Sequence, residues 1–200
     1  KSNTEENQEY MDKSFTYQYL PWRGITDKTM KFFGVETKAS PEGEPVAIGL
    51  NWPNGRIQIR SRLQKSFLTQ GEKKTETGNL FGMDRFPAGS AKAITITEGA
   101  LDAMAAFQMQ GSKYPCVSVT SSSSAKSDCG KDYEYLNSFD RIYLCFDMDE
   151  PGQKAASEVA SLFDFNKVYH VKMSGKDPND YLLDPKLSQD LFMKAWWAAK

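Results

Sequence analysis

The second half of the chain alternates between short apolar runs and longer amphipathic stretches. Four apolar or β-branched runs are short and nearly continuous, as in strands that are buried on both faces. They cover Ala93 to Thr97, Cys116 to Val119, Ile142 to Phe146 and Lys167 to Val171. Helical periodicity covers Ala100 to Gln110 and Gln153 to Phe163. Strands that alternate with helices predict an α/β fold, in which a parallel sheet carries helices on both faces.

The first half shows the period of two that is typical of half-buried strands. Two alternating runs, Val46 to Trp52 and Arg56 to Leu63, flank the turn Pro53-Asn54-Gly55 and predict a β-hairpin. One face of the second run carries the polar side chains Arg56, Gln58, Arg60 and Arg62. That face either contacts phosphate groups or is only solvated. The loop that follows, Thr69 to Gly78, is polar and is expected to be mobile.

The change of pattern near residue 90 predicts how the chain is organised. Residues 1–14 are polar and acidic, and we expect them to form a linker. Residues 15–90 are expected to form a smaller α+β subdomain with a short helix that Thr26 caps and Gly34 ends. Residues 91–200 are expected to form the α/β subdomain. Because the chain starts at Lys1 rather than at Met, we expect it to be a fragment of a longer protein.

Composition excludes several classes of protein. The 200 residues are 40% hydrophobic and 12% aromatic, which is enough for one or two packed cores. We expect a soluble protein, because no stretch has the length and apolar character of a membrane span or a signal peptide. Cys116, Cys129 and Cys145 have neither metal-ligand nor disulfide spacing, so we assign them to structure in a reducing compartment.

Charge is distributed unevenly, although the net charge is only −1. Basic residues dominate from Arg56 to Lys92, and acidic residues dominate from Glu98 to Glu150. A basic region beside an acidic one is typical of a metal-dependent enzyme that acts on a phosphate polymer. The alternative is a solvated surface with unevenly spread charges.

Two carboxylates, Asp147 and Asp149, end an apolar run just before Pro151-Gly152 breaks the pattern. Alternate side chains of an extended segment share a face, so these two lie on one side of the strand, roughly 7 Å apart. Neighbouring carboxylates attract a divalent cation, and oxygen ligands favour magnesium or manganese over zinc. The alternative is structural, since Asp149 or Glu150 could cap the helix that follows.

Further acids are candidates for the same site. Glu98 follows the first strand of the predicted parallel sheet, and functional side chains gather beyond the carboxyl ends of such strands. Glu98 could instead complement the dipole of the next helix. Asp102, one helical turn later, either joins the site or lies on an exposed polar face. Asp177 precedes Pro178, and capping would explain it fully. His170, the only histidine, is expected to pack or to lie at the surface.

Three acidic motifs together resemble those of the toprim fold, which primases, topoisomerases and some nucleases share. They are Thr97-Glu98-Gly99-Ala100-Leu101-Asp102, Phe146 to Ala156, and Lys176-Asp177-Pro178-Asn179-Asp180. Three further segments resemble the primase half of phage primase-helicases, a group related to the mitochondrial helicase Twinkle. They are Pro21 to Ile25, Asn79 to Gly82 and Asp132 to Leu136. The resemblance extends over roughly residues 15 to 198.

The resemblance implies a DNA primase, a nucleotidyltransferase that makes short RNA primers on single-stranded DNA from nucleoside triphosphates. It implies one or two Mg²⁺ or Mn²⁺ ions and no zinc site in this chain. The implied catalytic and metal-binding acids are Glu98, Asp147 and Asp149, with Asp102 and Asp177 as further metal ligands. The implied basic residues for template and nucleotide phosphates are Arg60, Arg62, Lys65, Lys126 and Lys131.

The resemblance also sets expectations about context. Such proteins usually carry a zinc-binding module ahead of this domain and a helicase behind it, so we expect both in the full-length protein. A phage-type replication protein implies a cytoplasmic location in an infected bacterium, without membrane contact. Ser121 to Ser124 stand where related sequences more often have glycines. Serines could still bind phosphate through backbone amides and hydroxyl groups.

Two other functions stay open at this point. A toprim nuclease or topoisomerase would use the same acids to cut DNA, although no tyrosine stands in a context that marks a nucleophile. A degenerate toprim domain would serve only as a DNA-binding or helicase-docking module. The intact acids argue against it, because a pure DNA-binding protein gains little from an acidic cluster that repels phosphate.

Overall fold

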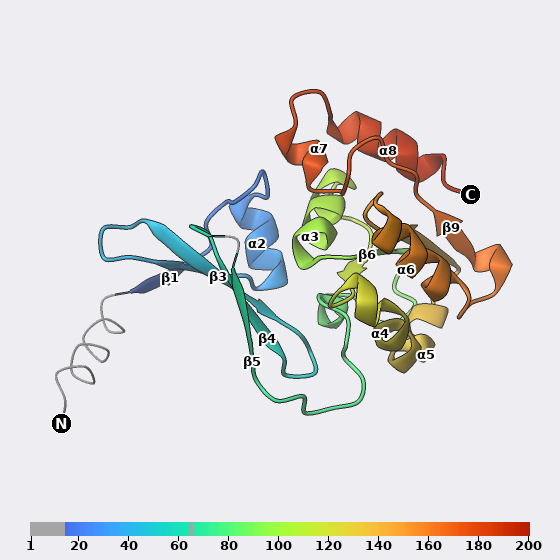
Figure 1. Ribbon diagram of the computed structural model, residues 1–200, viewed down its shortest axis with the longest axis horizontal. Coiled ribbons are helices and arrows are strands. Elements are labelled where there is room, and N and C mark those ends of the chain that lie inside the picture. The colour runs from blue at the N-terminus through green and yellow to red at the C-terminus, as the bar shows by residue number, and fades with distance from the viewer. Residues whose placement is uncertain (1–14, 65) are drawn as a thin grey trace.

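The computed structural model describes residues 15–64 and 66–200, which form two sheets with helices (Figure 1). The predicted linker at residues 1–14 lies outside the described residues. An antiparallel sheet comes first and a parallel sheet second. The prediction of a parallel sheet with flanking helices, preceded by a smaller α+β region, is therefore confirmed. The proposed boundary at residue 90 stays a prediction, because one hydrophobic cluster includes core residues from both regions.

The parallel sheet has the strand order β7-β6-β8-β9. Its strands are β6 (Ala93–Thr97), β7 (Cys116–Ser118), β8 (Arg141–Cys145) and β9 (Val168–His170). Every residue of β6 and β7 is buried, which explains why these strands appear in the sequence as continuous apolar runs. Thr97 pairs with Ser118 on one side and with Cys145 on the other. Three strands therefore end at the same level.

Helices cover the parallel sheet. They are α3 (Ala100–Met109), α4 (Ala125–Lys131), α5 (Tyr133–Asn137), α6 (Glu150–Ala160), α7 (Asp180–Leu183) and α8 (Gln189–Trp197). α3 packs against β6 and β7 and also contacts α8, whereas α6 contacts β8 and α4. α6 begins three residues before its predicted start at Gln153, because the Asp149 carboxylate accepts a hydrogen bond from the Gly152 amide (3.0 Å) and Pro151 fits the first turn.

The antiparallel sheet is a meander in the order β1-β2-β3-β4-β5. Its strands are β1 (Thr16–Gln18), β2 (Thr37–Ala39), β3 (Pro45–Asn51), β4 (Ile57–Ser61) and β5 (Phe67–Gln70). The predicted hairpin is β3 and β4, and the predicted short helix is α2 (Asp27–Phe33), capped by Thr26 and ended by Gly34 as expected. The prediction of a loop from Thr69 was wrong at its start, because Thr69 and Gln70 belong to β5.

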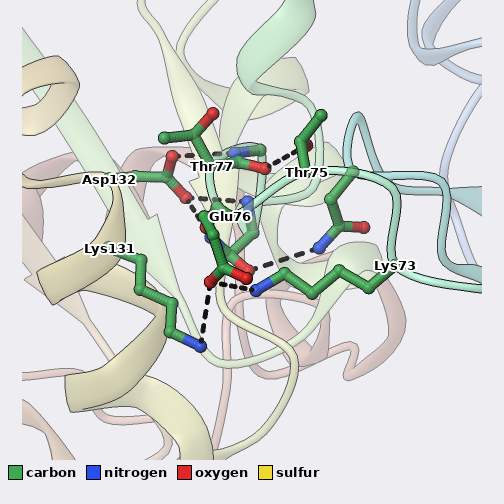
Figure 2. Close-up of polar contacts among 9 residues, drawn as sticks. Lys73, Thr75, Glu76, Thr77, Lys131 and Asp132 are labelled. Atoms are coloured by element: carbon green, nitrogen blue, oxygen red, sulfur yellow. Dashed lines mark hydrogen bonds and ion pairs between the residues drawn. The ribbon is translucent and has the colours of Figure 1, made fainter.

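The segment that connects the two sheets, residues 71–92, is anchored near its middle. Phe81 forms an isolated antiparallel bridge with Ser118 of β7. The buried carboxylate of Asp132 accepts hydrogen bonds from the backbone amides of Gly78 (2.8 Å) and Asn79 (2.7 Å), and Figure 2 shows this contact beside the exposed Lys73–Glu76–Lys131 ion pairs. These contacts hold the connecting segment against β7 and against Asp132, which lies between α4 and α5.

Two further observations concern the core and the surface. Cys116, Cys129 and Cys145 are free and buried, in agreement with the structural role expected for them. Burial raises the pKa of the Cys129 thiol, helped by Asp128 and Asp132 nearby. Within the described ranges, no helix is both long enough and apolar enough to cross a membrane.

Candidate active site between the two sheets

Acidic side chains gather where the parallel strands end. β6 and β8 finish side by side at Thr97 and Cys145, so Glu98 and Asp147 leave the sheet at the same edge. A recess of about 290 Å³ at this edge is lined by Glu98, Asp102 and Asp147 among others. The sequence-based expectation that acids from two different strands would meet at one edge therefore matches the geometry.

A lysine ammonium group lies between the two aspartates of the second acidic motif. Lys176 Nζ is 3.1 Å from Asp147 Oδ2 and 3.6 Å from Asp149 Oδ2. The same Asp149 side chain uses its other oxygen, Oδ1, to cap α6. Both interpretations of Asp149 are thus compatible, because one oxygen stabilises the helix while the second faces a cation. Sequence reasoning had not singled out Lys176, although it directly precedes Asp177.

The acids at this edge are held in unfavourable surroundings for negative charge. Burial raises the pKa of Glu98, and the charges of Asp147 and Asp149 raise it further, while the Ser122 hydroxyl and Lys176 lower it. Burial also raises the pKa of Asp147, against the lowering influence of Lys176. Burial is the main cause of both raised pKa values, and neighbouring carboxylates add to it, so the negative charge of these acids is held at a cost.

Glu98 is not a helix cap. The N-cap of α3 is Gly99, which offers no side chain for a capping bond. The Oε2 atom of Glu98 is buried and has no hydrogen-bond partner among the described residues. A buried carboxylate oxygen without a partner destabilises the fold unless a ligand or ion satisfies it.

Asp102 and Asp177 form the deeper end of the acidic edge. Burial raises the pKa of Asp102 well above its usual range, and Asp177 and Asp147 add to the effect. The Asp102 Oδ1 atom accepts a hydrogen bond from the Asn179 amide (3.2 Å), so Asp102 is not simply an exposed polar residue. Asp177 caps the turn before α7 by accepting a hydrogen bond from the Asp180 amide (2.9 Å), as the structural alternative expected.

A contact from the segment between β1 and α2 reaches the third acidic motif. The buried Asn179 accepts a hydrogen bond from Arg23 Nε (2.6 Å) and donates one to the Arg23 carbonyl (2.9 Å). These bonds hold the Arg23 backbone at a φ of 52°, which is unusual for a residue other than glycine. Neither residue was singled out from sequence, because the pairing joins segments that are 156 residues apart.

Arginines from the antiparallel sheet face this edge. Arg60 pairs with Ile48 across β3 and β4, and Ile48 is fully buried, so the arginine face of β4 is not merely solvated. Burial lowers the pKa of Arg60, and Arg23 adds to this, whereas Asp102 and Asp177 raise it. Arg60 and Arg62 also lie over the Trp22 ring, 5.6 and 5.2 Å from its centroid.

A basic groove adjoins the acidic recess. We use this name for a hollow of about 580 Å³. Its lining residues are Trp22, Arg23, Arg60, Ser61, Arg62, Leu63, Gln64, Ser66, Phe67 and Lys176. Among the described residues, the lining contains four cationic side chains and no acid, which suits the backbone of a nucleic acid. A comparable hollow of about 540 Å³ between α6 and β9 contains His170 but neither an acid nor an arginine.

The remaining predicted basic residues have different positions. Lys126 is exposed on α4. Lys131 is exposed at the end of α4, and its ammonium group lies 4.0 Å from Oε2 of Glu76 on the connecting segment (Figure 2). The structure does not bring Lys126 or Lys131 into either recess that carries the acids and arginines. Lys65 lies outside the described residues.

The serine loop lies beside the acidic recess. Thr120 and Ser121 line the recess, and Arg56 Nη1 donates a hydrogen bond to Thr120 Oγ1 (3.1 Å). The buried Asp128 holds the loop by accepting hydrogen bonds from the Thr120 amide and the Ser124 hydroxyl, both at 2.9 Å. The loop is therefore ordered by its own side chains, without the glycines that were expected from related sequences.

The fit of a metal ion is tested by the same residues. In the part of the chain that the structure describes, no three His, Cys, Asp or Glu side chains are arranged as a ready set of metal ligands. The donor chemistry nevertheless fits a hard cation, because Glu98 Oε2 lacks a partner and the Lys176 ammonium already lies between two carboxylates. The folded chain therefore accommodates a positive charge between these acids.

Comparisons with known proteins agree on one group. A family model described as toprim-like matches residues 95–182. A DNA helicase/primase of Enterobacteria phage T3 is 33% identical over 173 residues, which are 84% of this chain and 30% of the relative. The chain thus spans less than a third of that relative's length.

Solved structures extend the comparison. The primase fragment of the bacteriophage T7 primase-helicase is 29% identical, with a TM-score of 0.77 over 94% of this chain and 77% of that one. A chain from the bacteriophage T7 lagging-strand DNA polymerase complex with primase domains, bound to an RNA/DNA hybrid and dTTP, is 31% identical. It has a TM-score of 0.77 over 92% and 93% of the two chains. The DnaG primase catalytic domain bound to single-stranded DNA, 16% identical with a TM-score of 0.61 over 90% and 70%, shares the fold.

Proposed function

This chain belongs to the family of toprim primase domains found in phage primase-helicases, and from that premise we propose that it is a DNA primase core. Its reaction is the synthesis of short RNA primers on single-stranded DNA from nucleoside triphosphates. One observation carries the proposal: a groove with four cationic side chains opens beside a recess of partly buried acids. Cations to hold a phosphate backbone and acids to hold a catalytic metal are the two needs of a nucleotidyltransferase.

The two regions have separate tasks in this proposal. Residues 15–90 bind the template and the triphosphate, and residues 91–200 carry the catalytic acids. Arg60 supports this division, because it extends from the first region toward Asp102 and Asp177 of the second. The shared hydrophobic cluster supports a fixed arrangement of the two regions, so that template and acids stay aligned.

Glu98, Asp147 and Asp149 would hold one or two Mg²⁺ or Mn²⁺ ions, with Asp102 and Asp177 behind them. Two supports are the unpartnered Glu98 oxygen and the Lys176 ammonium between the aspartates. When bound, such an ion neutralises the triphosphate and lowers the pKa of the attacking 3′-hydroxyl group. Glu98 serves as a metal ligand or as a general base, since its free oxygen suits both roles.

The chain's own residues position the reactants. Arg60 and Arg62 bind template or nucleotide phosphates, and their stacking on Trp22 restricts how far they can swing. Lys176 lies 3.1 Å from Asp147 and 3.6 Å from Asp149, and its ammonium group would bind a triphosphate oxygen beside these acids. Asn179 keeps Arg23 and the third acidic motif together, so that the groove and the recess stay adjacent.

The full-length protein would add partners. The phage T3 relative is a DNA helicase/primase of which this chain spans 30%. We therefore propose that a helicase and a zinc-binding module accompany this domain in the cell, and that it works in the cytoplasm of an infected bacterium on single-stranded DNA.

The decisive experiment is extension of a short ribonucleotide annealed to single-stranded DNA, with triphosphates and Mg²⁺ or Mn²⁺. Wild type should extend it, and Asp149→Asn should not. Asparagine caps helices as well as aspartate does, so this variant keeps the α6 cap and removes only the negative charge. The matched control is Asp164→Asn, which changes a cap far from the acids.

Each of the other outcomes would contradict the proposal or favour a different function. Extension by Asp149→Asn at the wild-type rate would contradict the assigned role of the acids. Cut DNA instead of extended primer would favour a toprim nuclease. Tight DNA binding that does not depend on metal, with no extension by wild type under either metal, would favour a docking module.

A further inference from the structure

An aromatic side chain stands exposed on the strand beside the arginines. Phe67, in β5, is 69% exposed. Exposure alone means little here, because Leu63 and Leu68 of the same hairpin are also 74% and 56% exposed. Leu63 lines only the basic groove and Leu68 lines neither hollow, whereas Phe67 lines both.

Phe67 lies on the face that points to the active site. It pairs directly with Arg60 across β4 and β5, and directly opposed residues of antiparallel strands place their side chains on one face. Leu68 pairs with Ile59 and therefore points to the other face. Phe67 lines both the acidic recess and the basic groove, so it lies at the junction of the two hollows.

The ring of Phe67 has a free face. Trp22 is covered by Arg60 and Arg62, but within residues 15–64 and 66–200 no ring or cation stacks on Phe67. An aromatic ring beside guanidinium groups is the combination with which proteins bind unpaired bases, since the cations hold the phosphates and the ring stacks on the base.

We propose that Phe67 is the stacking platform for one unpaired base of the template strand, at the point where the strand passes from the basic groove to the acidic recess. This inference rests on the proposed primase function. A polymer is favoured over a free nucleotide, because Phe67 borders both hollows and only a strand that continues through the groove occupies both.

The test measures binding of a labelled single-stranded oligonucleotide by fluorescence anisotropy, with wild type, Phe67→Ala, Phe67→Trp and Leu68→Ala. Phe67→Ala should weaken binding roughly 5- to 150-fold, the range expected for about 1–3 kcal/mol of stacking on one base. Phe67→Trp should bind at least as tightly as wild type. Leu68→Ala is the matched control, exposed on the same strand but on the opposite face, and should bind like wild type.

A second oligonucleotide separates base from backbone. Wild type and Phe67→Ala should bind an oligonucleotide of the same length without bases equally tightly, because no base is left to stack. The slope of log affinity against log salt should be the same for both proteins, since no charge is removed.

The outcomes distinguish this inference from the proposed function. If wild type binds DNA and extends primers but Phe67→Ala does the same, the stacking role is wrong and the primase function stands. If Phe67→Ala weakens binding of a labelled triphosphate but not of DNA, the platform serves the nucleotide and the inference is overturned. If wild type neither binds DNA nor extends primers, both fail together.

Discussion

The two sheets differ in the sign of the charge that each holds partly buried at the site. The parallel sheet buries its strands and collects acids at one edge, where burial raises the pKa of Glu98 and Asp147. The antiparallel sheet turns an arginine toward that edge, where burial lowers the pKa of Arg60. Each sheet alone would hold charge in an unfavourable place. Together they place opposite charges around one hollow, and the residual imbalance is what a metal ion, a phosphate strand and a triphosphate can satisfy.

The sheets also differ in how firmly they hold their charged groups. Asp149 is fixed by a helix cap and Asp102 by a backbone amide, so the acidic edge is built from main-chain contacts. Arg60 and Arg62 are held by stacking on Trp22, and Arg62 also donates a hydrogen bond to the Pro21 carbonyl (3.2 Å). Acids held by main-chain contacts, beside arginines held by stacking, suit a site that must keep a metal and a template strand in a fixed arrangement.

The largest effect should follow a change at the acidic edge. Glu98→Gln keeps the size of the side chain and removes its charge, so primer extension should fall by at least about 10²-fold, the size typical of one lost electrostatic contact to a transition state. The thermal midpoint should stay the same or rise, because the glutamate is buried without a full set of partners. Steady-state extension and a melting curve check this, with Glu150→Gln as the exposed control. Normal extension by Glu98→Gln would remove Glu98 from the site.

A smaller effect should follow a change in the basic groove. Arg62→Ala should weaken binding of single-stranded DNA several-fold and reduce the slope of log affinity against log salt by about 1, as for one lost phosphate contact. Anisotropy titrations over a range of salt concentrations measure both. The control is Lys113→Ala, which removes the same charge from an exposed loop before β7. An unchanged salt slope for Arg62→Ala would show that Arg62 only packs against Trp22.

The same contrast explains what the sequence could predict. All four strands of the parallel half were predicted, because strands that are buried on both faces leave continuous apolar runs. Of the six helices among its described residues, only α3 and α6 were predicted. Glu98 and Asp147 could be found because each directly follows such a run. In the antiparallel half β5 was missed, since all four of its residues are exposed and carry no burial pattern.

Contacts across the two halves were beyond sequence reasoning. Arg23 and Asn179 meet only through the tertiary fold, and neither stands in a periodic pattern that marks it. The arginine face of β4 was identified correctly, but whether it faced solvent or the acids depends on how the sheets pack. Lys176 was hidden for the same reason, because its partners Asp147 and Asp149 come from a different motif.

A third prediction concerns stability. Asp102 has a pKa well above the usual range in the folded chain, so the folded state binds this proton more readily than the unfolded state does. Stability should therefore rise as pH falls from the raised folded value toward the ordinary aspartate value. Asp102→Asn should reduce this slope, to which the raised pKa values of Glu98 and Asp147 also contribute. It should stabilise the protein at neutral pH by on the order of 1 kcal/mol, or about 2–4 °C in the thermal midpoint. Melting curves from about pH 8 to about pH 5 test it. A steeper slope in the variant would contradict the assignment.

The smallest effect should follow a change at Lys176, and it tests whether the lysine ammonium group and a bound metal ion occupy the same place. Lys176 lies between Asp147 and Asp149 but is largely exposed, so Lys176→Gln should lower the free energy of unfolding in a chelator by at most about 1 kcal/mol. Adding Mg²⁺ should then raise the thermal midpoint of Lys176→Gln by more than that of wild type, because the ion no longer competes with an ammonium group. Lys154→Gln, exposed on α6, should behave like wild type. Equal Mg²⁺ shifts in all three proteins would show that lysine and metal occupy different places. The metal would then bind near Glu98 rather than between the two aspartates.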